Sequence, residues 1–296
     1  MLKGLPGALR RCGNDGYHLV RTSREWASVY AVEGPHGGTI RVLDVGGAYQ
    51  SATYLGKRRF EPVFSYYRTF DAVFAGARPV RRALMIGGGG CAWPKHAAAT
   101  RPGIRIDVVE EDPRIIDIAR RFFFVGELEA GRGEACRGEG GPRATAGGGF
   151  RAAAESGRGS ESSHGTIRLV AAEGRSYLDR CTIRYDAVLN DAFRGEDPAE
   201  SLATVEAARA VARILEPGGV YAANVVSRCG GADLSFLRDA VATLSEAFPN
   251  VQVIPCPDTG YSEEDNYLVV ATDAETRFSG ALPYDEGFPR SVLRDR

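Results

Sequence analysis

Four consecutive glycines join an apolar run to a helix-like segment, and the next apolar run ends on an acid. The first run covers Ala83 to Ile86, and the second, from Ile104, ends on Glu110. Glycines at such a turn let the backbone approach a ligand closely, and an acid after the next strand accepts hydrogen bonds from both hydroxyls of a ribose. A simple tight turn would also explain the glycines, but the flanking pattern favours a nucleoside site. Its expected contacts are Glu110, Gly87, Gly88 and Gly89.

Two more acids follow expected strands further along the chain. A third run ends with Glu173 and Gly174, and a fourth run, from Tyr185, ends on Asp191. The carboxyl ends of parallel strands meet in one crevice, which is where ligands bind. We therefore expect these acids to lie beside Glu110.

The segments around these acids alternate between strand and helix patterns, which predicts an α/β fold with a doubly wound sheet. Asp112, directly before Pro113, suits the start of a helix, where an acid is stabilised by the helix dipole. Further helices are expected over Val63–Phe74, Trp93–Thr100, Ile115–Phe124, Glu206–Leu215 and Asp233–Phe248, the last with an Asp cap. Later strands are expected over Val220–Val226, Val251–Ile254 and Tyr267–Thr272.

The ends of the chain and one internal segment lack this alternation. Tyr17 to Tyr54 has the spacing of a small antiparallel sheet, so we divide the chain into an N-terminal β-hairpin domain (1–62), a nucleoside-binding core (63–275) and a C-terminal tail (276–296). The segment Ala130–Gly165 contains 11 glycines and 5 arginines. Such a composition buries too little apolar surface to offset its ordering entropy, so disorder is expected. An arginine-glycine tract that binds RNA or a partner is the less favoured reading.

Composition narrows the class of protein. The 296 residues are 44% hydrophobic and 25% charged, with a net charge of −1, so there is no electrostatic case for nucleic acid. The six cysteines form no C-x-x-C pair and the four histidines are scattered, so no metal site is indicated and a reducing cytoplasm fits. We expect no signal peptide and no membrane span.

Several motifs together resemble the spermidine synthase family, the polyamine aminopropyltransferases. Asp191–Leu202 matches the family's loop after the fourth strand at the first Asp and at the whole Pro-Ala-Glu-Ser-Leu end. Gly47–Ser51 is similar to the family's Asp-Gly-x-x-Gln strand, and Phe64–Tyr66 to the start of its Phe-Ser-Tyr-Gln-Glu helix. The similarity runs from about Val42 to Asp273, apart from the insertion.

This resemblance implies a fold, a reaction and a set of roles. The fold is the S-adenosylmethionine-dependent methyltransferase-like (Rossmann-like) sheet with a small N-terminal β-domain, which helps to form a homodimer. The reaction is aminopropyl transfer from decarboxylated S-adenosylmethionine to a polyamine-type amine, with no metal. Asp191 then orients and deprotonates the amine, although it could also merely cap the loop that follows. Gln50 and Tyr66 contact donor and acceptor, and Glu173 or the backbone beside it meets the adenine edge.

The chain departs from the family where amines are bound. Gly90 replaces an Asp of the glycine loop, Tyr67 and Arg68 replace Gln-Glu, and Arg194 replaces the second Asp of the later loop. Fewer acids and more arginines disfavour a small dication such as putrescine. Two alternatives stay open: a methyltransferase that uses S-adenosylmethionine, with Arg68 or Arg194 on the donor carboxylate, and a non-catalytic dimeric nucleoside-binding homologue.

Overall fold

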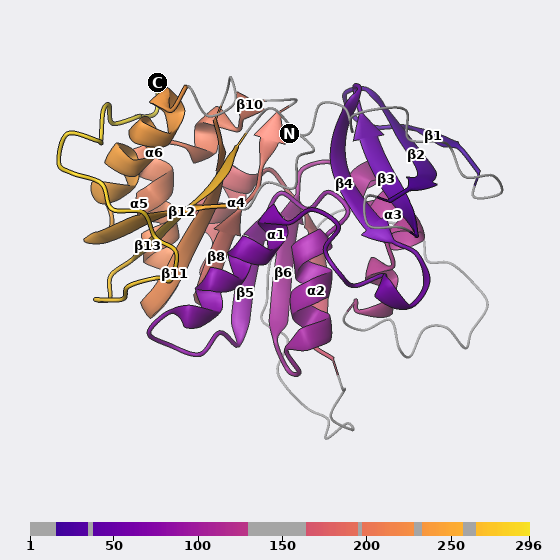
Figure 1. Cartoon of the computed structure of the whole chain (residues 1–296), viewed down its shortest axis with the longest axis horizontal. Coiled ribbons are helices and arrows are strands. Elements are labelled where there is room, and N and C mark those ends of the chain that lie inside the picture. The colour runs from indigo at the N-terminus through magenta and orange to yellow at the C-terminus, as the bar shows by residue number, and fades with distance from the viewer. Residues whose placement is uncertain (1–15, 35–37, 130–163, 195–196, 228–232, 257–264) are drawn as a thin grey trace.

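A computed structural model describes residues 16–34, 38–129, 164–194, 197–227, 233–256 and 265–296, without the side chains of 194, 197 and 198. The segment predicted to be disordered, Ala130–Gly165, lies outside these residues except for His164 and Gly165. The described chain forms a small antiparallel sheet beside a larger sheet that is covered by helices (Figure 1).

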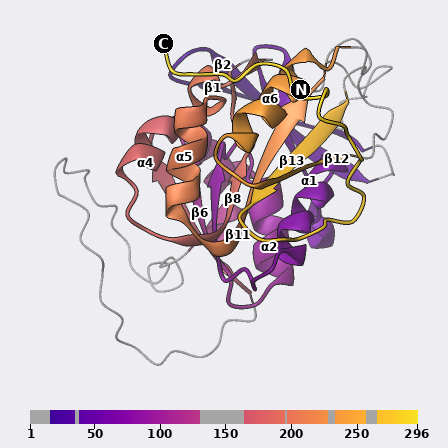
Figure 2. The ribbon, with the colours of Figure 1, turned by 90° about the vertical axis from the view of Figure 1, so that its left-hand side faces the viewer.

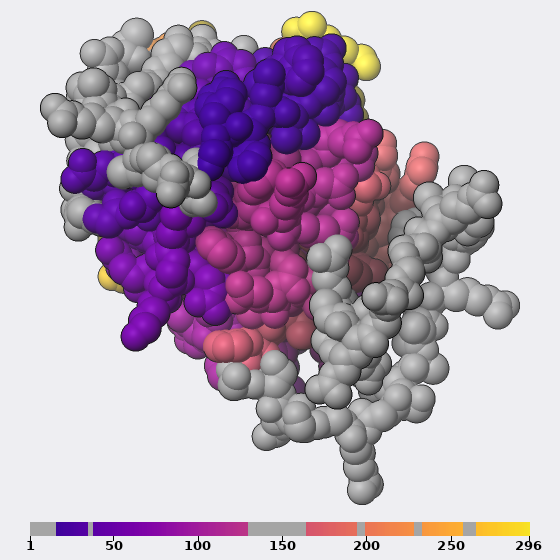
Figure 3. All heavy atoms as spheres, turned by 90° about the vertical axis from the view of Figure 1, so that its right-hand side faces the viewer, coloured from indigo at the N-terminus to yellow at the C-terminus, as the bar shows by residue number. Residues whose placement is uncertain are grey.

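The small sheet is antiparallel and follows chain order, as the spacing of Tyr17 to Tyr54 predicted. Its strands are β1 (His18–Arg21), β2 (Trp26–Glu33), β3 (Thr39–Val45) and β4 (Ala48–Tyr54). Buried side chains on β2 alternate with more exposed ones, so one face of the sheet packs against the core. Figure 3 shows this sheet, in indigo, directly against the magenta part of the core.

The large sheet has seven strands in the order β12-β13-β11-β8-β5-β6-β7. Five neighbouring strands of this order, β11, β8, β5, β6 and β7, are parallel to one another. Strand β13 runs antiparallel to both of its neighbours, β11 and β12. Because the central strands are covered on both faces, they are almost continuously apolar. The strands are β5 (Arg82–Ile86), β6 (Arg105–Glu110), β7 (Thr166–Ala171), β8 (Tyr185–Asn190), β11 (Leu215–Val226), β12 (Asn250–Pro255) and β13 (Asn266–Thr272).

Helices cover the two faces of this sheet (Figure 2). Side chains of β5 point alternately to the two faces of the sheet. Met85 belongs to the hydrophobic core shared with α2 and the small sheet, whereas Leu84 and Ile86 belong to the core shared with α4, α5 and α6. The helices are α1 (Tyr66–Thr69), α2 (Ala92–Thr100), α3 (Pro113–Phe122), α4 (Gly174–Arg180), α5 (Val205–Ile214) and α6 (Ser235–Ser245). None of the described helices has the length and apolar character needed to cross a membrane.

Three local predictions need correction. The helix predicted over Val63–Phe74 is the short α1 followed by a 3-10 helix, Phe70–Ala75, whose three-residue period brings Phe70 and Val73 to the buried side. The third strand ends at Ala171, so the acid that follows it belongs to the start of α4. The N-cap of α6 is Leu234, and Asp233 instead accepts a hydrogen bond from the Ser235 amide at 2.9 Å.

The C-terminal segment, for which the sequence indicated no role, packs back onto the core. The Arg175 guanidinium donates to both carboxylate oxygens of Asp295, at 2.8 and 2.7 Å. Thr204 donates to the same carboxylate at 2.7 Å, and the Leu282 amide donates to the Val253 carbonyl at 2.8 Å. These contacts hold the segment against β12, α4 and the start of α5.

Candidate active site

The glycine turn connects β5 to α2 and lies against the end of β8. Gly87 has a φ of 88°, and a Cβ there would lie 2.5 Å from the Asp191 carbonyl oxygen, so only glycine fits this close approach. The turn is held from the other side by Glu110, the last residue of β6. Glu110 Oε2 accepts hydrogen bonds from the Gly88 and Gly89 amides at 3.0 and 3.2 Å.

The second oxygen of Glu110 has room for a ligand. Oε1 accepts one hydrogen bond, from the Asp112 amide at 3.1 Å. A carboxylate oxygen has two lone pairs, so Oε1 has capacity for one more donor, such as a ribose hydroxyl. Burial raises the pKa of Glu110, while the three backbone amides act in the opposite direction. This side chain is therefore part of the turn's own structure as well as an expected nucleoside contact.

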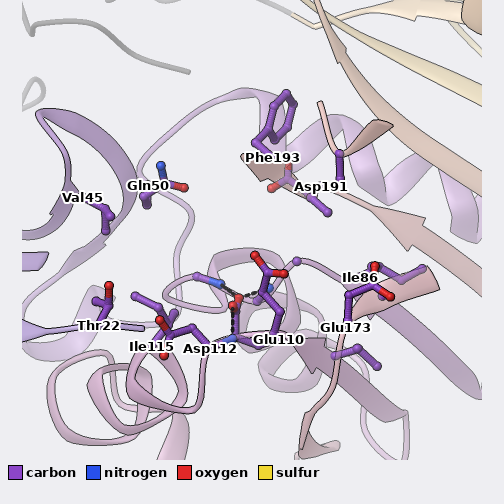
Figure 4. A pocket seen from close by; sticks show the side chains of 18 of the residues that line it. Thr22, Val45, Gln50, Ile86, Glu110, Asp112, Ile115, Glu173, Asp191 and Phe193 are labelled. Atoms are coloured by element: carbon purple, nitrogen blue, oxygen red, sulfur yellow. Dashed lines mark hydrogen bonds between the residues drawn. The ribbon is translucent and has the colours of Figure 1, made fainter. Parts of the chain in front are cut away.

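A cavity of about 250 Å³ opens beside the turn. Figure 4 shows Gln50, Glu110, Glu173 and Asp191 around this cavity. Gln50 comes from β4 of the small sheet, Glu110 and Asp191 from the ends of β6 and β8, and Glu173 from the start of α4. Of the nine site residues expected from the sequence, eight line it, and Tyr66 is the exception. The residues brought together are Gln50, Gly87, Gly88, Gly89, Glu110, Glu173, Gly174 and Asp191.

Asp191 stands just past the end of β8 and is held by hydrogen bonds. Asn224 Nδ2 donates to its Oδ1 at 2.8 Å, and the Tyr66 hydroxyl donates to its Oδ2 at 3.4 Å. Burial raises the pKa of Asp191 to about 6, although these donors favour the charged form. At neutral pH the group is therefore mainly a carboxylate whose basicity exceeds that of an ordinary Asp.

Two tyrosines of α1 share this end of the cavity. The rings of Tyr66 and Tyr67 are in contact, with centroids 4.1 Å apart, and it is Tyr67 that lines the cavity while Tyr66 reaches Asp191 with its hydroxyl. Burial raises the pKa of both phenols well above the usual value, so both are neutral donors. The motif predicted only Tyr66, because the sequence alone does not show which neighbouring ring faces the cavity.

Glu173 caps helix α4. Its Oε1 accepts from the Arg175 amide at 3.1 Å and its Oε2 from the Ser176 amide at 2.8 Å. Both oxygens are thus engaged by the first turn of the helix, and Gly174 lines the cavity beside them. A base edge at this point would meet the backbone near Gly174 more readily than the capping carboxylate.

The β1–β2 loop forms a wall that sequence reasoning missed. Thr22 to Glu25 line the cavity, and the Ser23 amide donates to Asp112 Oδ2 at 2.7 Å. The same Asp112 caps α3 through the Arg114 amide at 2.8 Å, as its place before Pro113 predicted. No local pattern marks this loop, because its role depends on how the small sheet docks on the core.

Three positions at which the sequence departs from the resembled family, Gly90, Arg68 and Arg194, are placed differently relative to the cavity. A Cβ at Gly90 would lie 2.6 Å from both Phe123 Cδ1 and Ser51 Oγ, so the packed ring and hydroxyl occupy the space of a side chain there. Arg68 is exposed and does not line the cavity, contrary to the expectation that it faces the bound amine. The side chain of Arg194 lies outside the described part of the chain.

The cavity is rich in carboxylates. Among the described lining residues the one basic side chain is Arg24, and it forms an ion pair with Glu111 at 3.0 Å. Within the described ranges, His, Cys and carboxylate side chains form no group of three that could hold a metal ion. The lining acids are Glu25, Glu110, Glu111, Asp112, Glu173 and Asp191.

Comparison with curated proteins gives a partial match in sequence. A protein of Vibrio vulnificus named polyamine aminopropyltransferase is 27% identical over 186 residues, which make up 62% of this chain and 50% of that protein. The matched region thus spans about half the length of this relative. Protein-family models give no match.

Comparison with solved structures shows the fold. A probable spermidine synthase of Corynebacterium glutamicum aligns with a TM-score of 0.69 at 19% identity, over 96% of this chain and 98% of that one. A spermidine synthase in complex with the transition-state analogue AdoDATO aligns with a TM-score of 0.61 at 16% identity, over 98% and 91%. Human methyltransferase-like protein 13 in complex with SAH aligns with a TM-score of 0.51 at 19% identity, over 74% and 85%.

The resemblance drawn from the motifs is therefore confirmed at the level of fold and partial sequence. The seven-stranded sheet with helices on both faces and the separate four-stranded sheet are those expected for this class. The motifs, the matching curated relative and the shared fold agree that the chain is spermidine synthase-like, with the methyltransferase-like fold.

Proposed function

We propose that the protein transfers an aminopropyl group from decarboxylated S-adenosylmethionine to an amine. The observation that carries this proposal is Asp191, a buried carboxylate with a pKa raised to about 6, next to the nucleoside turn. In the reaction the amine nitrogen attacks the carbon beside the sulfonium, and the bond from that carbon to sulfur breaks. The bonding electrons go to sulfur, which leaves as the thioether methylthioadenosine. The proton lost by the amine goes to Asp191.

The nucleoside half of the donor is assigned to the glycine turn and Glu110. The free capacity of Glu110 Oε1 suits a ribose hydroxyl, and the turn lets the ligand approach the backbone. Gln50 comes from the small sheet and Gly174 from the start of α4, so the nucleoside would be enclosed from both sides. The AdoDATO complex of a spermidine synthase with the same fold supports this assignment.

The charge of the cavity favours a donor without a carboxylate. A sulfonium and an ammonium are both attracted by the lining acids, whereas the carboxylate of S-adenosylmethionine would be repelled. Arg24 is already paired with Glu111, and Arg68 is exposed. Among described residues there is thus no free cation at the cavity to receive a donor carboxylate, which counts against the methyltransferase alternative.

Donor binding and turnover test the proposal together. Calorimetry compares decarboxylated S-adenosylmethionine with S-adenosylmethionine, and release of methylthioadenosine is then measured over a panel of amines. We expect tighter binding of the decarboxylated donor and turnover that falls by roughly 10²–10⁴-fold in Asp191→Asn, the usual effect of losing a general base. Preference for the carboxylated donor, with formation of S-adenosylhomocysteine, would establish the methyltransferase instead. Donor binding without turnover of any amine would indicate a non-catalytic homologue.

We also infer that the protein forms a homodimer through its small sheet. Three of the large apolar side chains exposed on the described chain cluster there: Tyr17 is 51%, Leu19 52% and Trp26 51% exposed. Neighbouring exposed apolar side chains often mark an interaction surface. Light scattering after size-exclusion chromatography should give twice the chain mass, and Trp26→Lys should shift the protein toward the monomer.

A further inference from the structure

Asn224 is a buried amide on β11 that no motif of the sequence indicates. It is 9% exposed, and its Nδ2 donates to Asp191 Oδ1 at 2.8 Å. Its own carbonyl oxygen Oδ1 is buried and has no hydrogen-bond partner among the described residues. Its neighbours on the strand are the apolar Ala222, Ala223 and Val225.

Stability of the fold does not account for this amide. A buried acceptor without a partner is destabilising, and an apolar side chain of similar shape would avoid that penalty. Among the described residues, the one hydrogen bond that the Asn224 side chain makes is to Asp191. The position is therefore explained by what the amide does to that carboxylate.

The two oxygens of Asp191 are held unequally. Oδ1 receives the short Asn224 hydrogen bond, while Oδ2 receives the Tyr66 hydroxyl at the long distance of 3.4 Å. Rotating the amide by half a turn would place its carbonyl oxygen against an ionised carboxylate, so the charge on Asp191 itself fixes the amide's orientation. Oδ2 is left as the oxygen better able to accept a proton.

We propose that Asn224 is a positioning residue, which holds Oδ1 of Asp191 so that Oδ2 accepts the proton of the attacking amine. This inference rests on the proposed aminopropyl transfer. Asn224 itself need not touch the substrate, because it acts through the carboxylate. Its buried carbonyl oxygen is the cost of presenting the N–H in this orientation.

Among the described residues, the other titratable groups facing Asp191 are neutral near pH 7. They are Tyr66 and Tyr67 of α1 and Cys256, which directly follows β12; burial raises the pKa of both phenols well above its usual value and that of the thiol to about 11. The hydrogen bonds from Asn224 and Tyr66 both lower the pKa of Asp191, with Asn224 the stronger of them, and the nearby Tyr67 hydroxyl acts in the same direction. Loss of the Asn224 N–H therefore raises the pKa of Asp191 above about 6.

The experiment titrates Asp191 directly, so that it does not depend on turnover. Carbon NMR of Asp-labelled protein gives the carboxyl pKa in the native chain, with Asp191→Asn identifying the resonance. Asn224→Leu removes the amide at nearly constant shape, and Asn224→Ser restores a smaller donor. Tyr221→Phe is the matched control, because this residue of the same strand contacts Asn190 rather than Asp191.

We expect Asn224→Leu to raise the Asp191 pKa by about one pH unit or more, the effect of losing one hydrogen bond to a charged group. Asn224→Ser should recover part of the shift, and Tyr221→Phe should show none. The acidic limb of the turnover profile should move by the same amount, with activity recovering at higher pH. An unchanged Asp191 pKa in Asn224→Leu, or an equal loss of activity at every pH, overturns the inference. Absence of turnover in the native chain refutes the proposed reaction but leaves the NMR result to decide the positioning role.

Discussion

Lys95 lies in the core on α2, next to β4, and replacing it with Met should stabilise the protein. It is 1% exposed, and its Nζ donates to Thr53 Oγ1 at 3.0 Å and lies 5.6 Å from the centre of the Phe123 ring. A charged ammonium has three N–H groups to donate, and the one hydrogen bond to Thr53 does not replace the hydration that the group has in water. Burial accordingly lowers the pKa of Lys95 from 10.5 to about 7.

The size of the effect follows from linkage. Between pH 7 and 10.5 the unfolded chain binds the lysine proton and the folded chain releases it, so stability rises with pH across this window. Below pH 7 both states are charged and the full penalty remains. At about 1.4 kcal/mol per pH unit, the penalty is roughly 4 kcal/mol at pH 7 and about 1 kcal/mol at pH 10. These are upper bounds, because water penetration and relaxation reduce the cost of a buried charge.

Urea unfolding of the native chain and of Lys95→Met at pH 7 and pH 10 measures this difference. Lys57→Met is the matched control, since Lys57 is exposed. We expect Lys95→Met to gain about 2–4 kcal/mol at pH 7 and much less at pH 10. Thr53 is not orphaned by the change, because its hydroxyl also donates to the Arg59 carbonyl at 2.9 Å.

Comparing the variants at each pH cancels the titration of the tyrosines and cysteines that do not interact with Lys95. The Cys91 thiol does interact with Lys95, but burial raises its pKa to about 12, so in the folded chain it stays protonated at both pH values. The reasoning is refuted if the stability difference is the same at both pH values, because Lys95 would then have the same pKa in the folded and unfolded chains. If Lys95→Met instead lost stability at pH 7, the charged ammonium would be stabilised rather than destabilised by its surroundings in the folded chain.

Two further predictions concern the nucleoside turn. Glu110→Ala should weaken methylthioadenosine binding by about 1–3 kcal/mol in calorimetry, the cost of losing a charged hydrogen-bond partner, and an unchanged dissociation constant would remove this residue from the site. Gly90→Asp should not restore the acid of the resembled family. Because a Cβ there meets Phe123 and Ser51 at 2.6 Å, we expect about 1–3 kcal/mol of destabilisation, and a stable variant with tighter donor binding would contradict this packing.

Patterns that are local in the chain were sufficient for much of the fold. The strand, glycine turn, helix and terminal acid around Gly87 and Glu110 were predicted because each element has its own periodicity and the turn needs glycine. Asp191 was placed correctly near the turn because parallel strands end at one edge of a sheet. The helix over Val63–Phe74 was wrong, since the buried aromatic packing overrides its apparent period with a 3-10 turn.

The sequence by itself determined which residue types meet at the carboxyl edge of the sheet, and so the class of ligand that we expect there. Only the tertiary structure decided how they act there. The β1–β2 loop lines one side of the cavity, and Tyr67 rather than Tyr66 lines it from α1. Asn224 of β11 donates a hydrogen bond to Asp191, which follows the neighbouring strand β8. Each of these depends on contacts between segments far apart in the chain, and a side chain's direction and hydrogen-bond partner follow from that packing rather than from its neighbours in sequence.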